Sequence, residues 1–113
     1  HDIVFLATPE YNGSLPPLVI NTLTWISRQK PSPFRHAVFG IAGVSSGKYA
    51  TIWAQSHLRD LLTKAGTLVV PTLLGVGPAG DAFDDDGAPI EPQIKHKVTQ
   101  IVKELTLFSR GGA

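Results

Sequence analysis

The stretch Ile3-Val4-Phe5-Leu6-Ala7-Thr8-Pro9-Glu10-Tyr11-Asn12-Gly13-Ser14 carries the pattern from which the fold of this chain can be predicted. Its first five residues form a continuous apolar run, which is too short for a helix and is typical of a strand buried on both faces. A helix is predicted over residues 18–28, because Pro16 and Pro17 suit a first turn that needs no amide donors there.

The alternation of strands and helices continues to the end of the chain. A second apolar run over residues 37–42 precedes a helix predicted over residues 49–65, with Gly66 as its terminator. A third strand is predicted over residues 68–70. Strands that alternate with helices run parallel through right-handed crossovers, so we expect a three-layer α/β domain with a parallel sheet.

The helices are predicted to be amphipathic, with one apolar side that packs on the sheet. In the first helix, the apolar residues assigned to a single packed side are Leu18, Leu23, Trp25 and Ile26. In a last helix near the end of the chain, residues that recur every three or four positions are Ile94, Val98, Ile101, Val102, Leu105 and Phe108.

Composition indicates one ordinary globular domain and excludes several classes of function. The chain has 113 residues, of which 42% are hydrophobic and 17% charged, with a net charge of +1. The weak, scattered positive charge argues against a nucleic-acid partner, and no apolar run is long enough to span a membrane. There is no cysteine, so redox chemistry requires a bound cofactor. We expect a cytoplasmic protein.

Two loops follow the carboxyl ends of predicted strands, where ligands bind in parallel α/β sheets. In the loop over residues 8–14, Gly13 lets the backbone approach a flat ligand, Tyr11 offers an aromatic face, and Asn12 can both donate and accept hydrogen bonds. A plain turn explains the same residues equally well, with positive φ at Asn12 and Gly13 and with Ser14 capping the next helix.

The first loop, together with Pro16, Asn21 and the segment Trp25-Ile26-Ser27-Arg28, closely resembles the NADPH-dependent FMN reductase family. That family includes flavin, quinone, azo-dye and chromate reductases, and in it this loop wraps the isoalloxazine ring. The resemblance implies a flavodoxin-like fold. The flavin-binding residues that it implies in this loop are Pro9, Glu10, Tyr11, Asn12, Gly13 and Ser14.

The resemblance extends to the loop over residues 43–48, where the family often has a glycine-rich segment that contacts the other edge of the ring. The residues that it implies here are Gly43, Ser45, Ser46 and Gly47. Amides and hydroxyls at a helix start suit an electron-rich edge, although a plain serine cap is an alternative. A nucleotide P-loop is excluded, since Ala42 and Tyr49 stand where glycine and Ser or Thr are required.

Four further features of the sequence bear on the function. The segment Asp84-Asp85-Asp86-Gly87 predicts an exposed turn rather than a calcium loop, because Ala82 and Gln93 stand where the first and last ligands belong. The histidines lack metal-ligand spacing, so no metal site is predicted. For Glu10 two hypotheses stay open, a surface charge beside a helix or an inter-subunit salt bridge. Phe83 resembles a family position near a subunit interface.

The resemblance implies an NAD(P)H-dependent flavin oxidoreductase that passes hydride from NADPH through bound FMN to a small-molecule acceptor. The acceptor would be a quinone, an azo compound, a metal oxyanion or free flavin, and the assembly a homodimer or homotetramer. This transfer needs no side-chain acid or base, so no catalytic residue is predicted. The alternatives are a non-catalytic flavodoxin-like electron carrier and a cofactor-free oligomerising fragment.

The resemblance covers residues 1–113, as a single partial domain, but only the later two-thirds of a usual family member. The first strand-helix-strand unit with its phosphate-binding loop does not match, and His1 stands directly beside a strand. We therefore expect a piece of a longer protein, with a bare edge on its first strand. We also expect FMN affinity to be lower by several kcal/mol, because charge-assisted phosphate contacts are lost.

Overall fold

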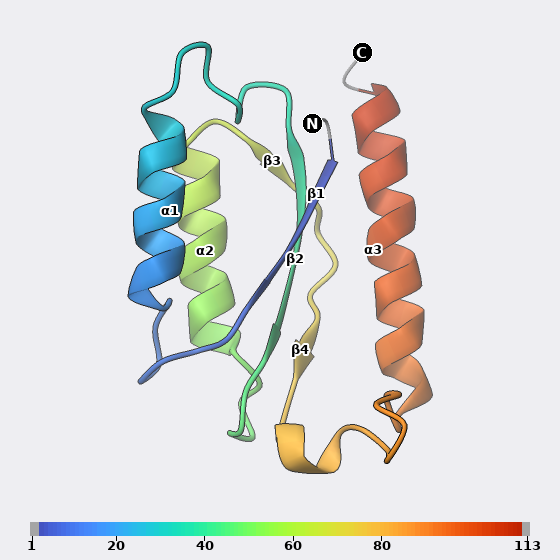
Figure 1. Cartoon of the computed structure of the whole chain (residues 1–113). Coiled ribbons are helices and arrows are strands. Elements are labelled where there is room, and N and C mark those ends of the chain that lie inside the picture. The colour runs from blue at the N-terminus through green and yellow to red at the C-terminus, as the bar shows by residue number, and fades with distance from the viewer. Residues whose placement is uncertain (1–2, 112–113) are drawn as a thin grey trace.

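The computed structural model describes residues 3–111, so His1 lies outside the described part. Its elements are β1 (Ile3–Thr8), α1 (Pro17–Ser27), β2 (Val38–Val44), α2 (Ile52–Lys64), β3 (Leu68–Val69), β4 (Gly75–Val76), the 3-10 turn η1 (Ala79–Asp81) and α3 (Pro92–Gly111). The sheet lies between α1 and α2 on one face and α3 on the other (Figure 1). The predicted parallel three-layer α/β architecture is therefore confirmed.

Strand β2 is the centre of the sheet and pairs in parallel with all three other strands. On one side it pairs with β1, and on the other side it pairs first with β3 and then with β4. The third strand was predicted over residues 68–70, whereas β3 ends at Val69. Pro71, which has no amide hydrogen to donate to a ladder, follows it. The pairing resumes at Gly75, so β4 is a strand that the sequence pattern did not predict.

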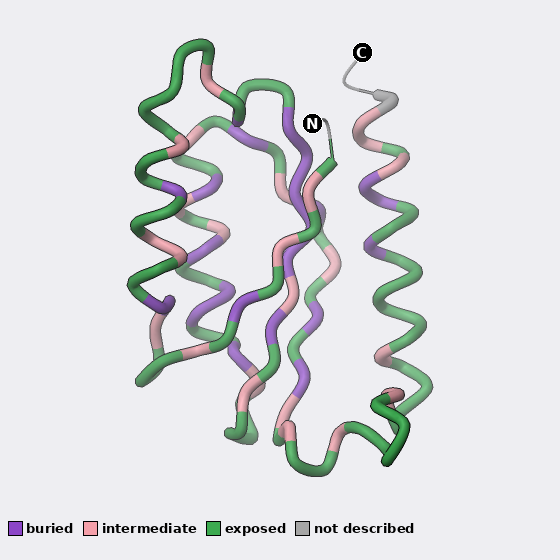
Figure 2. The backbone as a smooth tube through the Cα atoms, in the orientation of Figure 1, coloured by how far each residue is buried: buried purple, intermediate pink, exposed green. Residues whose placement is uncertain are grey.

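Two apolar cores hold the layers together, and Figure 2 shows the buried residues gathered on the central strands and on the facing sides of the helices. The core on the α1–α2 face contains Leu15, Leu23, Phe34, Ala37, Phe39, Ile41, Ala54, Leu58 and Leu62. The core beneath α3 contains Val38, Val70, Leu74, Val76, Ile101 and Leu105. At Gly40 a Cβ would lie 2.6 Å from Ile101, so glycine lets α3 pack closely on β2.

Strand β1 lies at an edge of the sheet, and its predicted burial on both faces is wrong. Val4 and Leu6 pack against the α1–α2 core, whereas Ile3 and Phe5 are 43% and 41% exposed. Side chains alternate along a strand, so the exposed pair lies on the face of α3. Helix α3 packs on β2 and its other neighbours rather than covering β1. The expected bare edge is confirmed, since β1 pairs with no described strand except β2.

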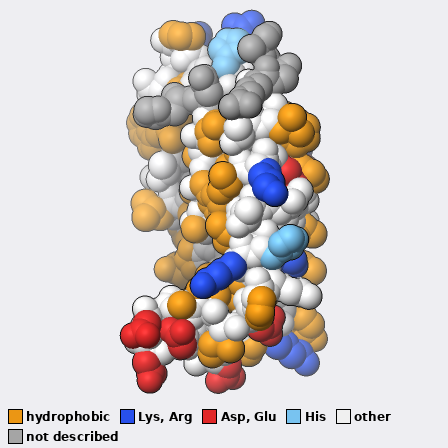
Figure 3. All heavy atoms as spheres, turned by 90° about the vertical axis from the view of Figure 1, so that its right-hand side faces the viewer, with side chains coloured by type: hydrophobic (Ala, Val, Ile, Leu, Met, Phe, Trp, Pro, Cys, Tyr) orange, Lys and Arg blue, Asp and Glu red, His pale blue; other side chains and the backbone are white. Residues whose placement is uncertain are grey.

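The helices differ in detail from the predicted ones. In α1 the inward side carries Leu23 with Ile26, whereas Leu18 and Trp25 are exposed, so their predicted packing is wrong. The buried stripe of α3 is narrower than predicted, because Val102 is about half exposed. In Figure 3, which faces the α3 side, apolar side chains run along the surface and acidic side chains gather at its lower end.

Helix α2 begins three residues later than predicted, at Ile52. The reason is local backbone conformation, because Ala50 and Thr51 have φ values of 53° and 67°, which lie outside the right-handed helical region. The end of the helix agrees with the prediction. Gly66 has a φ of 93°, the left-handed conformation that glycine adopts at a helix terminus.

Candidate functional site

The two loops nominated by topology lie side by side at the carboxyl ends of neighbouring strands. The register of the sheet pairs Thr8, where β1 ends, with Gly43 near the end of β2. In Figure 1 both loops lie at the same end of the sheet, at the bottom of the view. Both loops therefore lie at the edge of the sheet where ligands bind in parallel α/β folds.

The first loop contains a two-residue hairpin turn. Tyr11 and Ser14 exchange two backbone hydrogen bonds, of 2.9 and 3.0 Å, and the residues between them have positive φ, 51° at Asn12 and 76° at Gly13. This is the pattern of a type I′ turn, for which Asn-Gly is favoured. Within residues 3–111, the amides of Asn12 and Gly13 donate to no backbone carbonyl. The turn therefore presents two adjacent, free hydrogen-bond donors.

The surroundings of this turn suit the edge of a flat heterocycle. Tyr11 is 57% exposed, and a Cβ built on Gly13 would meet no described atom within 4 Å. The alternative interpretation of this loop was a plain turn in which Ser14 caps the next helix. The turn is confirmed, but the helix cap is wrong. The N-cap of α1 is Pro16, which makes no side-chain cap bond, and Ser14 uses its backbone within the turn.

Glu10 joins the first loop to the start of α2. Its Oε1 atom accepts a hydrogen bond of 2.7 Å from the amide of Ala54, in the first turn of that helix. A carboxylate is stabilised there by the free amides and by the helix dipole. Neither hypothesis for Glu10 had included this contact. The side chain is engaged within the chain, which leaves the backbone of Glu10 for a ligand.

The second loop is fixed to the sheet by its first half. Gly43 is buried, and a Cβ there would lie 2.2 Å from Thr51 Oγ1, so this glycine makes room for Thr51. The amide of Ser45 donates to Val76 at 3.0 Å, and its carbonyl accepts from Ala79 at 2.8 Å. Ser45 therefore has no free backbone group to offer a ligand.

The second half of this loop is open. Ser46 and Gly47 are exposed, and a Cβ on Gly47 would meet no described atom within 4 Å. The plain serine cap is wrong, because the N-cap of α2 is Thr51 and it makes no side-chain cap bond. Of the four predicted residues, Ser46 and Gly47 are thus the ones that a ligand can reach freely.

The segment after the loop packs tightly on β4 and its continuation. A Cβ on Gly75 would lie 2.2 Å from the carbonyl oxygen of Ala50, and one on Gly77 would lie 2.4 Å from that of Gly47. The left-handed conformations of Ala50 and Thr51 are unfavourable for residues with a Cβ. Tertiary packing against the two glycines imposes them, and no pattern in residues 43–51 signals this.

A network of buried polar groups lies on the side of β2 away from β1. We call this network, which is formed by Arg59, Thr72, Gln100 and Glu104, the Glu104 clamp. Glu104 is 9% exposed and accepts hydrogen bonds from the amide and hydroxyl of Thr72 and from Gln100. Arg59 donates to the carbonyls of Val70 and Thr72, at 2.9 and 3.3 Å. The clamp links α2, α3 and the chain between β3 and β4, and no pattern in the sequence predicts it.

The clamp shifts the pKa values of both charged groups. Burial raises the pKa of Glu104, but the hydrogen bonds from Thr72 and Gln100 and the charge of Arg59 outweigh burial and leave this pKa below its ordinary value. Burial lowers the pKa of Arg59, and the charge of Glu104 opposes that effect only in part. Glu104 is therefore held in its charged form.

The remaining predicted motifs are structural. Asp84 Oδ1 accepts hydrogen bonds of 2.9 Å from the amides of Asp86 and Ala88, and Gly87 has a φ of 82°, which confirms an exposed turn. Phe83 forms an isolated bridge with Pro89 and is 37% exposed. No helix in the described residues is both long and apolar enough to cross a membrane.

The whole chain was compared with known protein families and proteins. A sequence model of the NADPH-dependent FMN reductase family matches residues 1–81. An NAD(P)H-dependent FMN reductase of Pseudomonas aeruginosa is 32% identical over 111 residues, which cover 96% of this chain and 60% of that protein. A 2-hydroxy-1,4-benzoquinone reductase of a Burkholderia species is 43% identical over 65 residues, or 53% of this chain and 33% of that protein.

A solved structure supports the fold. The flavoenzyme FerB of Paracoccus denitrificans, an NAD(P)H:acceptor oxidoreductase, superposes with a TM-score of 0.79 at 23% sequence identity. The match covers 93% of this chain and 61% of FerB, so this chain spans about three-fifths of the length of FerB and of the Pseudomonas aeruginosa reductase. The family match over residues 1–81 and the flavodoxin-like fold agree with the motif in the first loop, and the chain belongs to the NADPH-dependent FMN reductase family.

Proposed function

We propose that this chain is the ring-binding part of an NAD(P)H-dependent FMN reductase. The observation that carries the proposal is the exposed type I′ turn of the first loop, whose two free amides lie at the same end of the sheet as the open half of the second loop (Figure 1). Free amides with no side chain in front of them suit the polar edge of a flat ring. FMN, when bound, supplies the two-electron hydride chemistry that connects NAD(P)H to an acceptor.

The residues of the two loops would bind and orient the ring. In the first loop the amides of Asn12 and Gly13 would donate to its polar edge, and the ring of Tyr11 would lie against the ligand. In the second loop, the amides of Ser46 and Gly47 would face the other edge. The Glu10–Ala54 hydrogen bond would hold the first loop in place relative to α2. No side chain is required to move a proton in this scheme.

The electron acceptor in this proposal is a quinone, with azo compounds, metal oxyanions and free flavin as the other classes. A similar protein is named a 2-hydroxy-1,4-benzoquinone reductase, and the region of that similarity covers 53% of this chain. The open space in front of Gly13 and Gly47 leaves room for a flat acceptor beside the ring. A cytoplasmic location, where NAD(P)H is supplied, belongs to the same proposal.

Self-association as a homodimer or homotetramer is also part of the proposal. Large apolar side chains are exposed on α1 and α2, among them Leu18, Trp25 and Trp53. Exposed apolar groups of this size are frequent at interfaces between protein chains. Light scattering coupled to gel filtration should give a mass at least twice that of the chain. A mass of one chain at all concentrations would contradict this part.

The test of the reductase proposal uses the chain loaded with FMN in the absence of oxygen. Addition of NADPH or NADH should bleach the flavin absorbance at about 450 nm, and a quinone added afterwards should restore it. Unchanged absorbance of bound FMN in the presence of either nucleotide would contradict the proposal and favour a non-catalytic electron carrier. Failure of FMN to bind at all would favour a cofactor-free module.

A further inference from the structure

The residues directly before α2 have an unfavourable backbone conformation. Ala50 and Thr51 are consecutive left-handed residues, with φ values of 53° and 67°, and neither is a glycine. Such conformations persist only where the surrounding structure enforces them, and they are frequent at sites of function. The left-handed pair therefore needs restraints from outside its own backbone.

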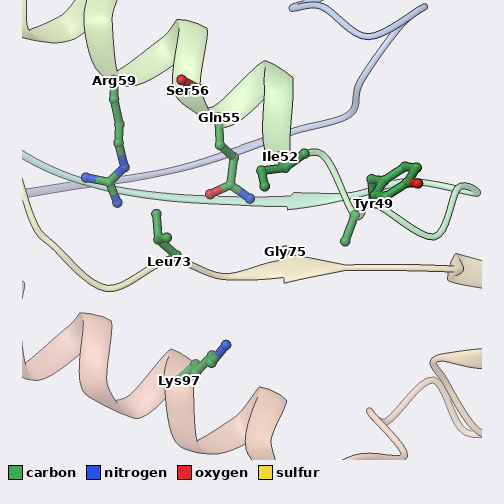
Figure 4. A pocket seen from close by; sticks show the side chains of 9 residues that line it. Tyr49, Ile52, Gln55, Ser56, Arg59, Leu73, Gly75 and Lys97 are labelled. Carbon is green, nitrogen blue, oxygen red and sulfur yellow. The ribbon is translucent and has the colours of Figure 1, made fainter.

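Packing restrains the left-handed pair only in part. The carbonyl oxygen of Ala50 lies against Gly75, where there is no room for a Cβ. The same segment borders a cavity of about 410 Å³, which Tyr49, Ala50 and Ile52 help to line (Figure 4). Atoms that face open space have no van der Waals partners there. Directional interactions are needed to fix the segment where it borders the cavity.

The buried side chain of Gln55 provides these interactions. It is only 5% exposed, and its Nε2 atom donates to Thr51 Oγ1 at 2.9 Å and to the carbonyl oxygen of Leu74 at 2.8 Å. The hydroxyl hydrogen of Thr51 is already donated to the carbonyl of Ala50. Both acceptors therefore require a donor, which determines the orientation of the amide. Figure 4 shows Gln55 pointing from α2 toward the chain before β4.

The burial of this amide is costly, which argues against a role in stability alone. Gln55 Oε1 is buried without a hydrogen-bond partner among the described residues. A methionine would fill a similar space without an unpaired polar atom. Without the amide, the carbonyl of Leu74 would still accept a hydrogen bond of 3.0 Å from the amide of Gly43. The side chain of Gln55 therefore contributes more to geometry than to stability.

The left-handed pair determines where the open half of the second loop lies. Ser46 and Gly47 are placed between two fixed points of the chain. The first is Ser45, whose backbone amide and carbonyl are both hydrogen-bonded. The second is the pair that ends at Thr51, and within it the amide of Ala50 donates back to the carbonyl of Gly47 at 3.4 Å. Release of the second point would leave the open half of the loop without a fixed direction.

We propose that Gln55 is a positioning residue for the second loop. Its hydrogen bond to Thr51 holds the left-handed pair in place, and the pair presents the backbone of Ser46 and Gly47 to the flavin ring. Gln55 itself touches neither the flavin nor the acceptor. The inference rests on the proposed binding of the ring by the two loops, and it adds a residue of α2 that acts on that site through the backbone.

The difference between affinity and stability in Gln55→Met tests this role. We expect a urea unfolding midpoint close to that of the wild type, because the unpaired oxygen is removed together with the hydrogen bonds. We expect the dissociation constant of FMN to rise about tenfold, since the second loop loses its fixed shape. Gln100→Met makes the same change on α3, where the amide bonds to Glu104, and should bind FMN like the wild type. Unchanged FMN affinity in Gln55→Met would overturn the proposal.

Two substitutions at Thr51 test the same hydrogen bond from its other end. Thr51→Ser keeps the hydroxyl and should bind FMN within about threefold of the wild type. Thr51→Val keeps the shape without the hydroxyl and should lose affinity about tenfold. Gln55→Met combined with Thr51→Val should lose less than the sum of the two single losses, because both remove one shared hydrogen bond. Equal affinities of Thr51→Ser and Thr51→Val would overturn the proposal.

Hydrogen exchange in the absence of FMN separates this inference from the proposed function. The amides of Ala50 and Ile52, which are hydrogen-bonded next to the loop, should exchange at least about tenfold faster in Gln55→Met. The amide of Ala65, at the other end of α2, should exchange as in the wild type. If the wild type binds no FMN, the proposed function fails, and the exchange rates alone decide whether Gln55 holds the loop. Equal exchange at Ala50 and Ile52 in the two proteins would overturn the proposal.

Discussion

The two sides of β2 are built in different ways. On the β1 side, the first loop, which we propose to bind the ring, owes its shape to backbone conformation, with positive φ and free amides at Asn12 and Gly13. On the β4 side, the Glu104 clamp owes its shape to side chains, and its main hydrogen bonds join residues 32 positions apart in the chain. The first region is open and suited to a ligand, whereas the second is closed and suited to stability.

This comparison separates the molecule into a part that we propose to bind the ring and a part that holds the layers together. Changes in the clamp should therefore alter the free energy of unfolding, whereas changes in the first loop should alter ligand affinity. Residues between the two regions, at Glu10 and Gly43, should affect both.

Glu104→Ala should have the largest effect on stability. It leaves Thr72 without an acceptor and leaves the partly buried charge of Arg59 uncompensated, which costs about 2–4 kcal/mol of unfolding free energy. Urea unfolding followed by far-UV circular dichroism measures the loss, with exposed Lys103→Ala on the same helix as the control. A loss in Glu104→Ala no greater than that of the control would show that the clamp does not hold α3 in place.

Gly43→Ala and Gly47→Ala form a matched pair within the second loop. An added Cβ at Gly43 would lie 2.2 Å from Thr51 Oγ1, so we expect a loss of about 1–3 kcal/mol through overpacking. At Gly47 the space is open, so the same change should stay within about 0.5 kcal/mol. Equal unfolding midpoints for the two variants would contradict the packing role assigned to Gly43.

Glu10→Ala should have a smaller effect, because it removes one hydrogen bond to the first turn of α2. We expect a loss of about 1 kcal/mol, similar to that of an N-cap side chain, together with weaker FMN binding as the first loop loosens. Glu10→Gln keeps an acceptor at this position and should recover most of both effects. Recovery in neither property would mean that the charge, rather than the hydrogen bond, connects the loop to the helix.

The pH dependence of stability should show the smallest effect, and it comes from the clamp. The pKa of Glu104 is lowered in the folded chain, so its stabilising contribution is present above the ordinary glutamate value of about 4.3 and is lost as the pH falls through the lower folded value. The stability difference between wild type and Glu104→Gln should therefore shrink as urea titrations move from pH 6 to pH 3. A difference that grows over this interval would contradict the sign of the shift.

The β1 side could be predicted from sequence because its information is local. A short apolar run followed by Asn12-Gly13 encodes a strand and a turn within adjacent residues, and Gly66 likewise encodes a helix end. The parallel order of the strands also followed from their alternation with helices. These features depend on interactions between neighbours in the chain, so they can be inferred without a structure.

The β4 side could not be predicted because it depends on contacts between distant segments. Strand β4 has only two residues and no alternating pattern, and the left-handed conformation of Thr51 is imposed by packing. The exposure of Trp25 has a similar cause, since periodicity assigns an apolar side to a helix without showing how much of that side the sheet reaches. Sequence alone also did not show that Glu10 reaches α2 or that Glu104 reaches Thr72.

The central claim is that the first loop binds the flavin ring through its left-handed turn, and a titration of FMN into Gly13→Val tests it most directly. Gly66→Val is the matched control, because Gly66 also has positive φ and open space around it but lies at the other end of α2. Both variants should lose similar stability, since both place a branched residue in a left-handed conformation.

We expect fluorescence titration to show FMN bound by the wild type and by Gly66→Val with dissociation constants within about threefold of each other. We expect no measurable binding by Gly13→Val, because the branched side chain occupies the space in front of the two free amides. Equal FMN affinity in the two valine variants would contradict the claim and would leave the first loop as only a turn.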